Sequence, residues 1–162
     1  MARVLVLGLG NPLRGDDGIG PRVVTELHRR GLPEGVTALD FGTGGLDLLN
    51  VWQGWPRVIV VDAADVGRLH GEETVPGQIV RFTPDEVRFL VAPDGFSLHD
   101  AGLAEALALG EALGQDLPEL VILSVQPARI GWGEGLSPPV EAALPALLDA
   151  VMKEIRRIVA DV

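Results

Sequence analysis

Blocks of apolar and polar positions alternate along the chain and predict strands and helices in turn. Most of the short apolar runs are continuous, which is typical of strands that helices cover on both faces. The predicted strands are residues 3–8, 36–41, 57–63, 77–82 and 119–125. Apolar residues at helical spacing predict three helices, carried by Ile19, Val23, Val24 and Leu27; by Leu103, Leu107 and Leu113; and by Val140, Leu144, Leu147, Val151, Ile155 and Ile158.

This alternation predicts an α/β fold of three layers, with a five-stranded, mostly parallel twisted sheet and helices on both faces. The run at 77–82 follows the third strand without a helical pattern between them, so we expect it to be the one antiparallel strand. Residues 44–52 predict a further short helix. With 162 residues, the chain fits a single domain spanning 1–162 with one core.

Two predicted loops exceed ordinary connection length. They cover residues 64–77 and 126–139, both are rich in glycine and proline, and the second carries Trp132 in an exposed setting. Loops of this length in a compact domain are more often functional than idle.

Composition narrows the classes of function. The chain has no cysteine, which excludes disulfides, thiol nucleophiles and cysteine-bound zinc. Its net charge of −10 argues against a nucleic-acid partner. No apolar run approaches the ~20 residues that a membrane span requires, and the first one is too short for a signal peptide. We therefore expect a cytoplasmic protein without a membrane or nucleic-acid partner.

Candidate ligands follow several of the predicted strands. Asp16 and Asp17 come after the first strand, Asp62 ends the third, and His99 precedes the helix that starts near residue 100. In open α/β sheets, ligands bind beyond the carboxyl ends of the parallel strands. Asp17, Asp62 and His99 would form an open set of oxygen and nitrogen ligands, suited to Zn, Ni, Fe or Mn. We expect Asp16 to hold the turn as a helix cap.

A dinucleotide site is the main alternative for the first turn, since Gly8 and Gly10 begin a G-x-G pattern. The next glycine is displaced to Gly15, and Pro12 lacks the N–H that a phosphate would use. The two aspartates would also repel an anion from the helix start. The turn therefore favours a cation over a phosphate.

Four stretches make the chain resemble the hydrogenase maturation endopeptidases, which process the large subunit of [NiFe] hydrogenases. They are VLGLGNPLRGDDGIG at 6–20, VVDAADVG at 60–67, SLHDAGL at 97–103 and GLSPPVEAAL at 135–144. GLGNP also opens the peptidyl-tRNA hydrolases, but their basic surface and tRNA-end-binding motifs are absent from this acidic chain. The resemblance runs almost end to end and implies the same five-stranded sheet.

The resemblance also implies a site. The metal-contacting and catalytic residues of the family fall on Asp17, Asp62 and His99. Some members carry a Pro-Glu pair where this chain has Pro127-Ala128. The residues expected to contact the substrate are Asp16, Gly42, Thr43, Gly44, Gly45, Gln126 and Pro127.

The implied reaction is removal of a C-terminal extension from the large-subunit precursor after nickel insertion. Nickel would arrive with the substrate as the recognition signal, and the resting enzyme, expected to be a monomer, would be free of metal. The attacking water could be activated by the metal or by a carboxylate, with Asp17 as the base. An aspartic-type pair of Asp17 and Asp62 is a further route. The alternative function is a non-catalytic module of this fold that binds a metal or a maturation factor.

Overall fold

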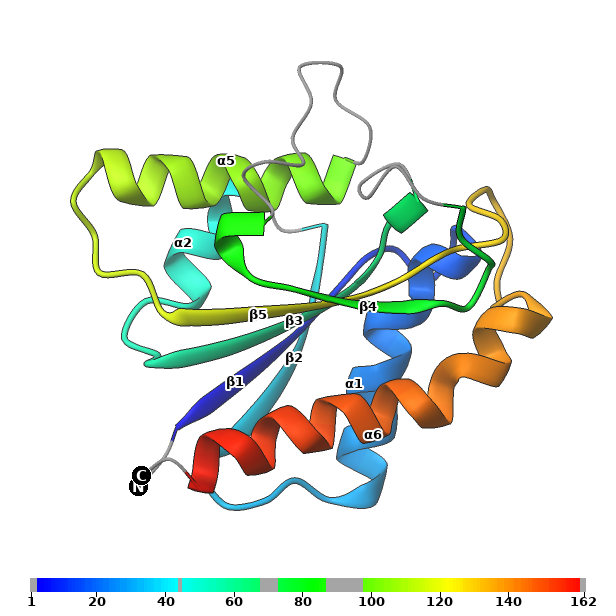
Figure 1. The fold of residues 1–162 in the computed structure, drawn as a ribbon, viewed down its shortest axis with the longest axis horizontal. Helices are drawn as coiled ribbons and strands as arrows, with labels where there is room; N and C mark the ends of the chain where they lie inside the picture. Colours follow the sequence, from blue (N-terminus) through cyan, green and yellow to red (C-terminus); the bar gives the residue numbers. More distant parts are fainter. Residues whose placement is uncertain (1–2, 44, 68–72, 87–97, 161–162) are drawn as a thin grey trace.

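The computed structural model describes residues 3–43, 45–67, 73–86 and 98–160. Within these ranges the chain forms a five-stranded sheet in the order β2-β1-β3-β5-β4, covered by helices on both faces (Figure 1). The predicted α/β fold is thus confirmed. The strands are β1 (Val4–Leu9), β2 (Val36–Gly42), β3 (Arg57–Ala63), β4 (Ile79–Phe82) and β5 (Glu119–Val125).

The strand directions also match the prediction. β1 pairs in parallel with β2 and β3, and β3 pairs in parallel with β5. β4 lies at the edge of the sheet and is antiparallel to β5. This strand is shorter than the predicted 77–82, because the chain turns at Gly77, whose φ is 90°. The carboxyl ends of β1, β3 and β5 consequently meet at one edge of the sheet.

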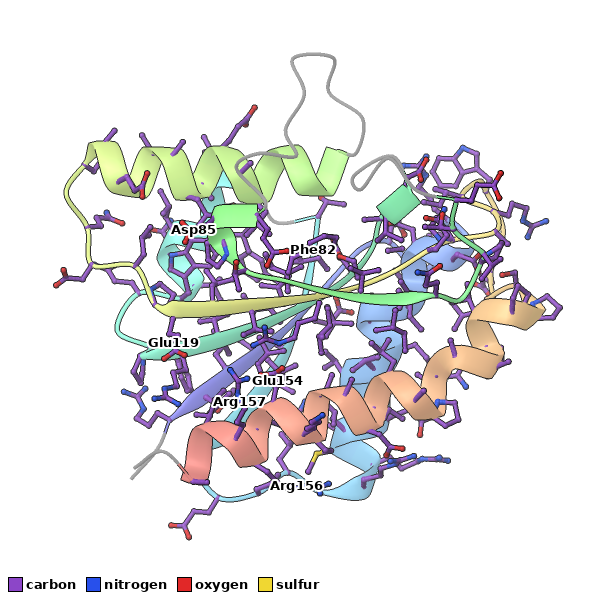
Figure 2. The ribbon with its side chains drawn as sticks, viewed as in Figure 1. Phe82, Asp85, Glu119, Glu154, Arg156 and Arg157 are labelled. Atoms are coloured by element: carbon purple, nitrogen blue, oxygen red, sulfur yellow. The ribbon has the colours of Figure 1, made fainter. Side chains whose placement is uncertain are left out.

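Helices cover the two faces in pairs. On one side lie α1 (Ile19–Arg30) and α6 (Pro138–Ala160). On the other lie α2 (Leu48–Val51) and α5 (Leu98–Ala112), together with the short 3-10 helix η2 (Gly45–Asp47). Figure 2 labels one residue on each side of the sheet: Phe82 packs in the core beneath α5, and Glu154 belongs to α6. Successive residues of a strand thus face opposite sides of the sheet and pack in separate cores.

One residue of a predicted helix is placed differently. Leu103 and Leu107 lie in α5 and are buried, but Leu113 lies beyond the end of this helix and is 61% exposed, so the prediction that it continues the helix is wrong. α5 ends at Ala112, and Gly114 follows with a φ of 68°. The left-handed glycine turns the chain away before another helical turn can bring position 113 onto the sheet.

Glycines let the start of α1 sit directly on the sheet. A Cβ added to Gly20 would overlap the carbonyl of Leu9 and come within 2.7 Å of the carbonyl oxygen of Val61. α1 and the 3-10 helix before it, η1 (Asp16–Gly18), therefore rest on the ends of β1 and β3. The glycine-rich turn serves this close approach of backbones.

The two ends of the described chain lie at the opposite edge of the sheet. β1 begins at Val4, and a guanidinium N–H of Arg57, at the start of β3, donates to the carbonyl of Ile158 in the last turn of α6 (3.3 Å). Figure 1 shows both ends at the same side of the molecule. Across the described ranges, no helix combines the length and the apolar character that a bilayer crossing requires.

Candidate active site

Asp62 lies near the carboxyl end of β3 with its side chain only 1% exposed. It is opposite Ser124 of β5, and the Ser124 hydroxyl donates a hydrogen bond of 2.6 Å to Asp62 Oδ1. Alternate residues of a strand face the same side of the sheet, so Asp62 faces the side of Val58 and Val60, which pack in the core beneath α5. The strand therefore holds this carboxylate at the sheet edge, in the layer between the sheet and α5.

Asp17 reaches the same edge from the first turn of the chain. It belongs to η1, which packs against β3, and it is also 1% exposed. The peptide N–H of Asn11 donates to its Oδ2 at 2.8 Å. Gly10, with a φ of 127°, lies against Asp17, and a Cβ on Gly10 would be 3.4 Å from the Asp17 carboxyl carbon. The turn thus positions Asp17 through backbone contacts that only glycine allows.

Asp16 holds the loop at 126–139. Its carboxylate accepts hydrogen bonds from the peptide N–H groups of Ala128 (2.8 Å), Arg129 (2.9 Å) and Ser137 (2.6 Å), and from the Ser137 hydroxyl (2.7 Å). Burial by itself would raise the pKa of Asp16, but the hydrogen bonds from Arg129, Ser137 and Ala128 lower this pKa below its ordinary value. The expectation that Asp16 holds its turn as a helix cap is wrong, because its carboxylate makes no capping hydrogen bond to η1 and instead anchors a distant loop.

Backbone hydrogen bonds join the two loops further. Gly15 donates to Gly133 O (2.8 Å), Asp16 to Arg129 O (3.0 Å), and Gly133 to Leu13 O (2.9 Å). The loop before η1 and the loop before α6 therefore form one hydrogen-bonded unit.

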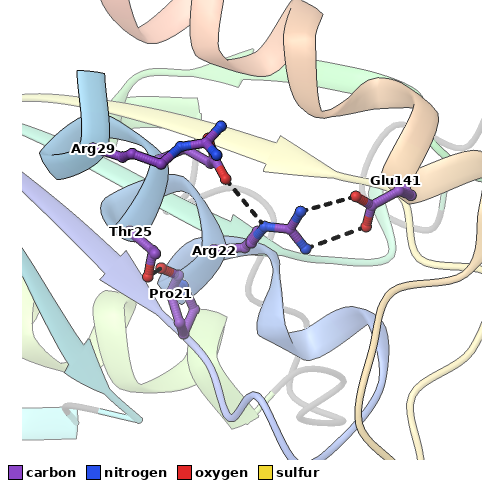
Figure 3. Close-up of polar contacts among 6 residues, drawn as sticks. Pro21, Arg22, Thr25, Arg29 and Glu141 are labelled. Atoms are coloured by element: carbon purple, nitrogen blue, oxygen red, sulfur yellow. Dashed lines mark hydrogen bonds and ion pairs between the residues drawn. The ribbon is translucent and has the colours of Figure 1, made fainter.

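An ion pair extends this unit onto the helices (Figure 3). Arg22 of α1 meets Glu141 in the first turn of α6, with the two nitrogen–oxygen distances at 3.0 and 3.4 Å. Arg29 pairs with Glu26 along α1 at 2.7 Å. The Arg22–Glu141 contact holds the start of α6 beside α1, directly after Ser137.

The glycine turn after β2 lies next to the Asp17 loop. The peptide N–H of Gly10 donates to the carbonyl of Gly42 at 2.7 Å, and Gly45 donates to the carbonyl of Thr43, also at 2.7 Å. η2 continues from this turn and packs against α5. Gly42, Thr43 and Gly45 thus border the site, whereas Gly44 lies outside the described residues.

Gln126 and Pro127 lie where β5 leaves the sheet. Gln126 Oε1 accepts hydrogen bonds from the Thr74 hydroxyl (3.1 Å) and the Gly67 N–H (3.3 Å), so it holds the loop that follows β3. Pro127 is half-buried, and its carbonyl accepts from the Gln126 amide (3.4 Å). Ala128 contacts Asp16 through its peptide N–H, so the alanine in place of the family's glutamate leaves the loop attached.

Position 99 lies in the first turn of α5, four residues before the buried Leu103. The side chain of His99 lies outside the described part of the chain, so its contact with the two aspartates stays a prediction. Among the described side chains, no three acidic or histidine groups gather closely enough to hold a metal ion. Ser124 was not among the predicted site residues. It could have been noticed in the sequence as the hydroxyl-bearing residue in the otherwise apolar stretch 120–125.

The chain is similar to known hydrogenase maturation proteins. Residues 21–154 match the family model described as hydrogenase maturation protease, HycI. The chain is 39% identical to the hydrogenase expression/formation protein HupD of Bradyrhizobium diazoefficiens, over 91% of this chain and 74% of the relative.

Two solved structures show the same fold. The hydrogenase maturating endopeptidase HybD from Escherichia coli superimposes with a TM-score of 0.79 at 31% identity, covering 96% of this chain and 93% of that one. The [NiFe] hydrogenase maturation protease HybD from Thermococcus kodakarensis superimposes with a TM-score of 0.71 at 29% identity, covering 93% and 97%.

Proposed function

The chain belongs to the hydrogenase maturation protease family, and on that premise we propose that it removes the C-terminal extension of a [NiFe] hydrogenase large-subunit precursor after nickel insertion. The protein is a hydrogenase maturation endopeptidase. The choice of a [NiFe] enzyme is supported by the similarity to the Thermococcus kodakarensis protease, which is described as acting on that class.

The observation that carries the proposal is the burial of Asp17 and Asp62 at one edge of the sheet. Each of the two carboxylates accepts a hydrogen bond, Asp17 from the Asn11 N–H and Asp62 from the Ser124 hydroxyl, and together they bring negative charge to this edge. The open edge of a parallel sheet is also where α/β proteins bind their ligands. Two buried acids at this edge favour a cationic ligand there.

Nickel fits this pair as part of the substrate. Carboxylate oxygens and neutral imidazole both accept Ni²⁺. We propose that Asp17 and Asp62 contact the nickel of the precursor, with His99 as the third ligand from the first turn of α5. The remaining coordination positions stay with the precursor's own ligands, so the metal is the signal that maturation has advanced far enough for cleavage.

Hydrolysis then needs a base beside the scissile peptide. We propose that Asp17 accepts a proton from the attacking water, whose oxygen forms a bond to the peptide carbonyl carbon. The carbon–nitrogen bond breaks as the proton passes to the departing amine. Asp62, held by the Ser124 hydroxyl, keeps a fixed orientation throughout. Nickel contributes positive charge that stabilises the oxyanion.

Three further properties belong to the proposal. The 162 residues act as one domain, the protein works as a monomer, and it acts in the cytoplasm. The lack of cysteine suits a reducing compartment, and the net charge of −10 opposes self-association. Gel filtration of the purified protein at micromolar concentration checks the oligomeric state.

The test is cleavage of a purified, nickel-loaded precursor. Asp17→Asn, Asp62→Asn and His99→Ala should each abolish cleavage, while Asp149→Asn, on the exposed face of α6, should cleave like the wild type. The melting temperature of Asp17→Asn should stay close to that of the wild type. Precursor binding without cleavage by the wild-type protein would favour the non-catalytic alternative, and equal cleavage of nickel-free precursor would refute the role of nickel.

A further inference from the structure

Three apolar side chains lie exposed beside the candidate active site. Leu13 is 49% exposed, Ile130 is 43% exposed and Trp132 is 82% exposed. They come from the two loops that hydrogen bonds join: Gly133, next to Trp132, donates to the carbonyl of Leu13, and Ile130 bridges to Gly15. Leu13, Ile130 and Trp132 are called the Trp132 surface below.

The loop that carries this surface is fixed in place. The carboxylate of Asp16 accepts its four hydrogen bonds from residues on both sides of Trp132, at Ala128, Arg129 and Ser137. An apolar group on a fixed loop loses little conformational freedom when a partner covers it. Tryptophan is also the residue type most enriched among those that dominate binding energy at protein interfaces.

Charge around the surface indicates the chemistry of its partner. Arg14 and Arg129 flank the apolar residues, and neither guanidinium forms an ion pair within the described ranges. A Cβ on Gly133 would lie 3.6 Å from a guanidinium nitrogen of Arg129, which places this cation beside the residue that follows Trp132 in the chain. Glu134 is the acidic exception on the same loop, in a protein whose net charge is −10. Two cations here suit a partner with carboxylates around an apolar patch.

The position of the surface identifies that partner. Leu13 precedes Asp17 by four residues, and the peptide N–H of Asp17 turns back to the carbonyl of Arg14. A protein seated on the Trp132 surface would therefore present its neighbouring chain to the carboxylates of the site. We propose that the Trp132 surface docks the folded body of the hydrogenase precursor, through an apolar patch of that protein bordered by acidic residues. This inference rests on the proposed function and adds a contact separate from the nickel ligands.

The experiment compares binding with turnover. Trp132→Ala should raise KM for the nickel-loaded precursor at least tenfold and leave kcat within about twofold. Arg129→Gln should raise KM less, and its effect should vanish at high salt. Leu113→Ser, just beyond the C-terminal end of α5 and 61% exposed, is the matched control and should behave as the wild type. In an Asp62→Asn background, which should not cleave, adding Trp132→Ala should also raise the dissociation constant for the nickel-loaded precursor at least tenfold.

The outcomes separate this inference from the proposed function. If the wild-type enzyme fails to cut the nickel-loaded precursor, the proposed function fails. If it cuts and Trp132→Ala leaves both KM and the dissociation constant unchanged, the docking proposal fails alone. A dimer of this protein that sedimentation detects, and that Trp132→Ala abolishes, would instead assign the surface to a second copy of the chain and overturn the proposal.

Discussion

Replacing Asp16 by Asn should destabilise the protein strongly, whereas the same change at its neighbour Asp17 should not. The Asp16 carboxylate accepts four hydrogen bonds, three of them on Oδ2 and one on Oδ1. Asn has only one side-chain oxygen. In the best orientation this oxygen replaces Oδ2, and the amide NH2 group then replaces Oδ1 and faces the Ser137 N–H, so that two hydrogen-bond donors meet. The loss of one bond to a charged group and the weakening of three others give a cost of about 3 kcal/mol.

That magnitude can be measured by heat and by denaturant. For a chain of this size, about 3 kcal/mol corresponds to a fall in melting temperature of roughly 6–12 °C. The loop should also open locally, so trypsin should cleave after the exposed Arg129 faster in Asp16→Asn than in the wild type. Asp17→Asn is the matched control, because it removes the same charge one residue away.

The pH dependence gives an independent check. Because the folded pKa of Asp16 is lowered, its contribution to stability is fully present above its ordinary pKa of 3.8 and is lost as the pH falls through the folded value. The difference in unfolding free energy between wild type and Asp16→Asn should therefore be constant from about pH 5 to 8 and should narrow below about pH 4. A difference under about 1 kcal/mol at pH 7, or one that does not narrow in acid, would refute this account of the loop.

Two other substitutions probe the packing that positions the site. Ser124→Ala should lower the unfolding free energy by about 1.5–3 kcal/mol, because it removes the donor to the buried Asp62, and an unchanged urea midpoint would contradict this. Gly20→Ala should cost more than about 3 kcal/mol, since its Cβ would overlap backbone of β1 and β3, whereas Gly131→Ala, with open space around it, should melt like the wild type.

The sheet could be predicted from the sequence because its three inner strands, β1, β3 and β5, are buried on both faces. The mostly apolar stretches 57–63 and 119–125 match β3 and β5 to the residue. The antiparallel direction of the edge strand was predicted because the sequence shows no helical pattern between the third and fourth predicted strands. Leu113 was misplaced because helical spacing carries no information about where a helix ends, and Gly114 decides that end by its backbone conformation.

The site was only partly predictable, for a different physical reason. Asp17 follows β1 and Asp62 lies near the end of β3, and the carboxyl ends of these strands share one edge, so their neighbourhood could be inferred. The partners of Asp16 could not, because Ala128, Arg129 and Ser137 are more than 100 residues away and act mainly through backbone N–H groups. Ser124 could be found only once the register that places it opposite Asp62 is known.

Because β1 starts and α6 ends at the edge of the sheet opposite Asp17 and Asp62, either end of the chain can carry an added group without approaching the cleavage site. Attachment to a sensor chip through a biotinylated N- or C-terminal tag would leave the Trp132 surface facing the solution. The same geometry favours fusion proteins in which this endopeptidase is delivered to a chosen hydrogenase by a linker at either end.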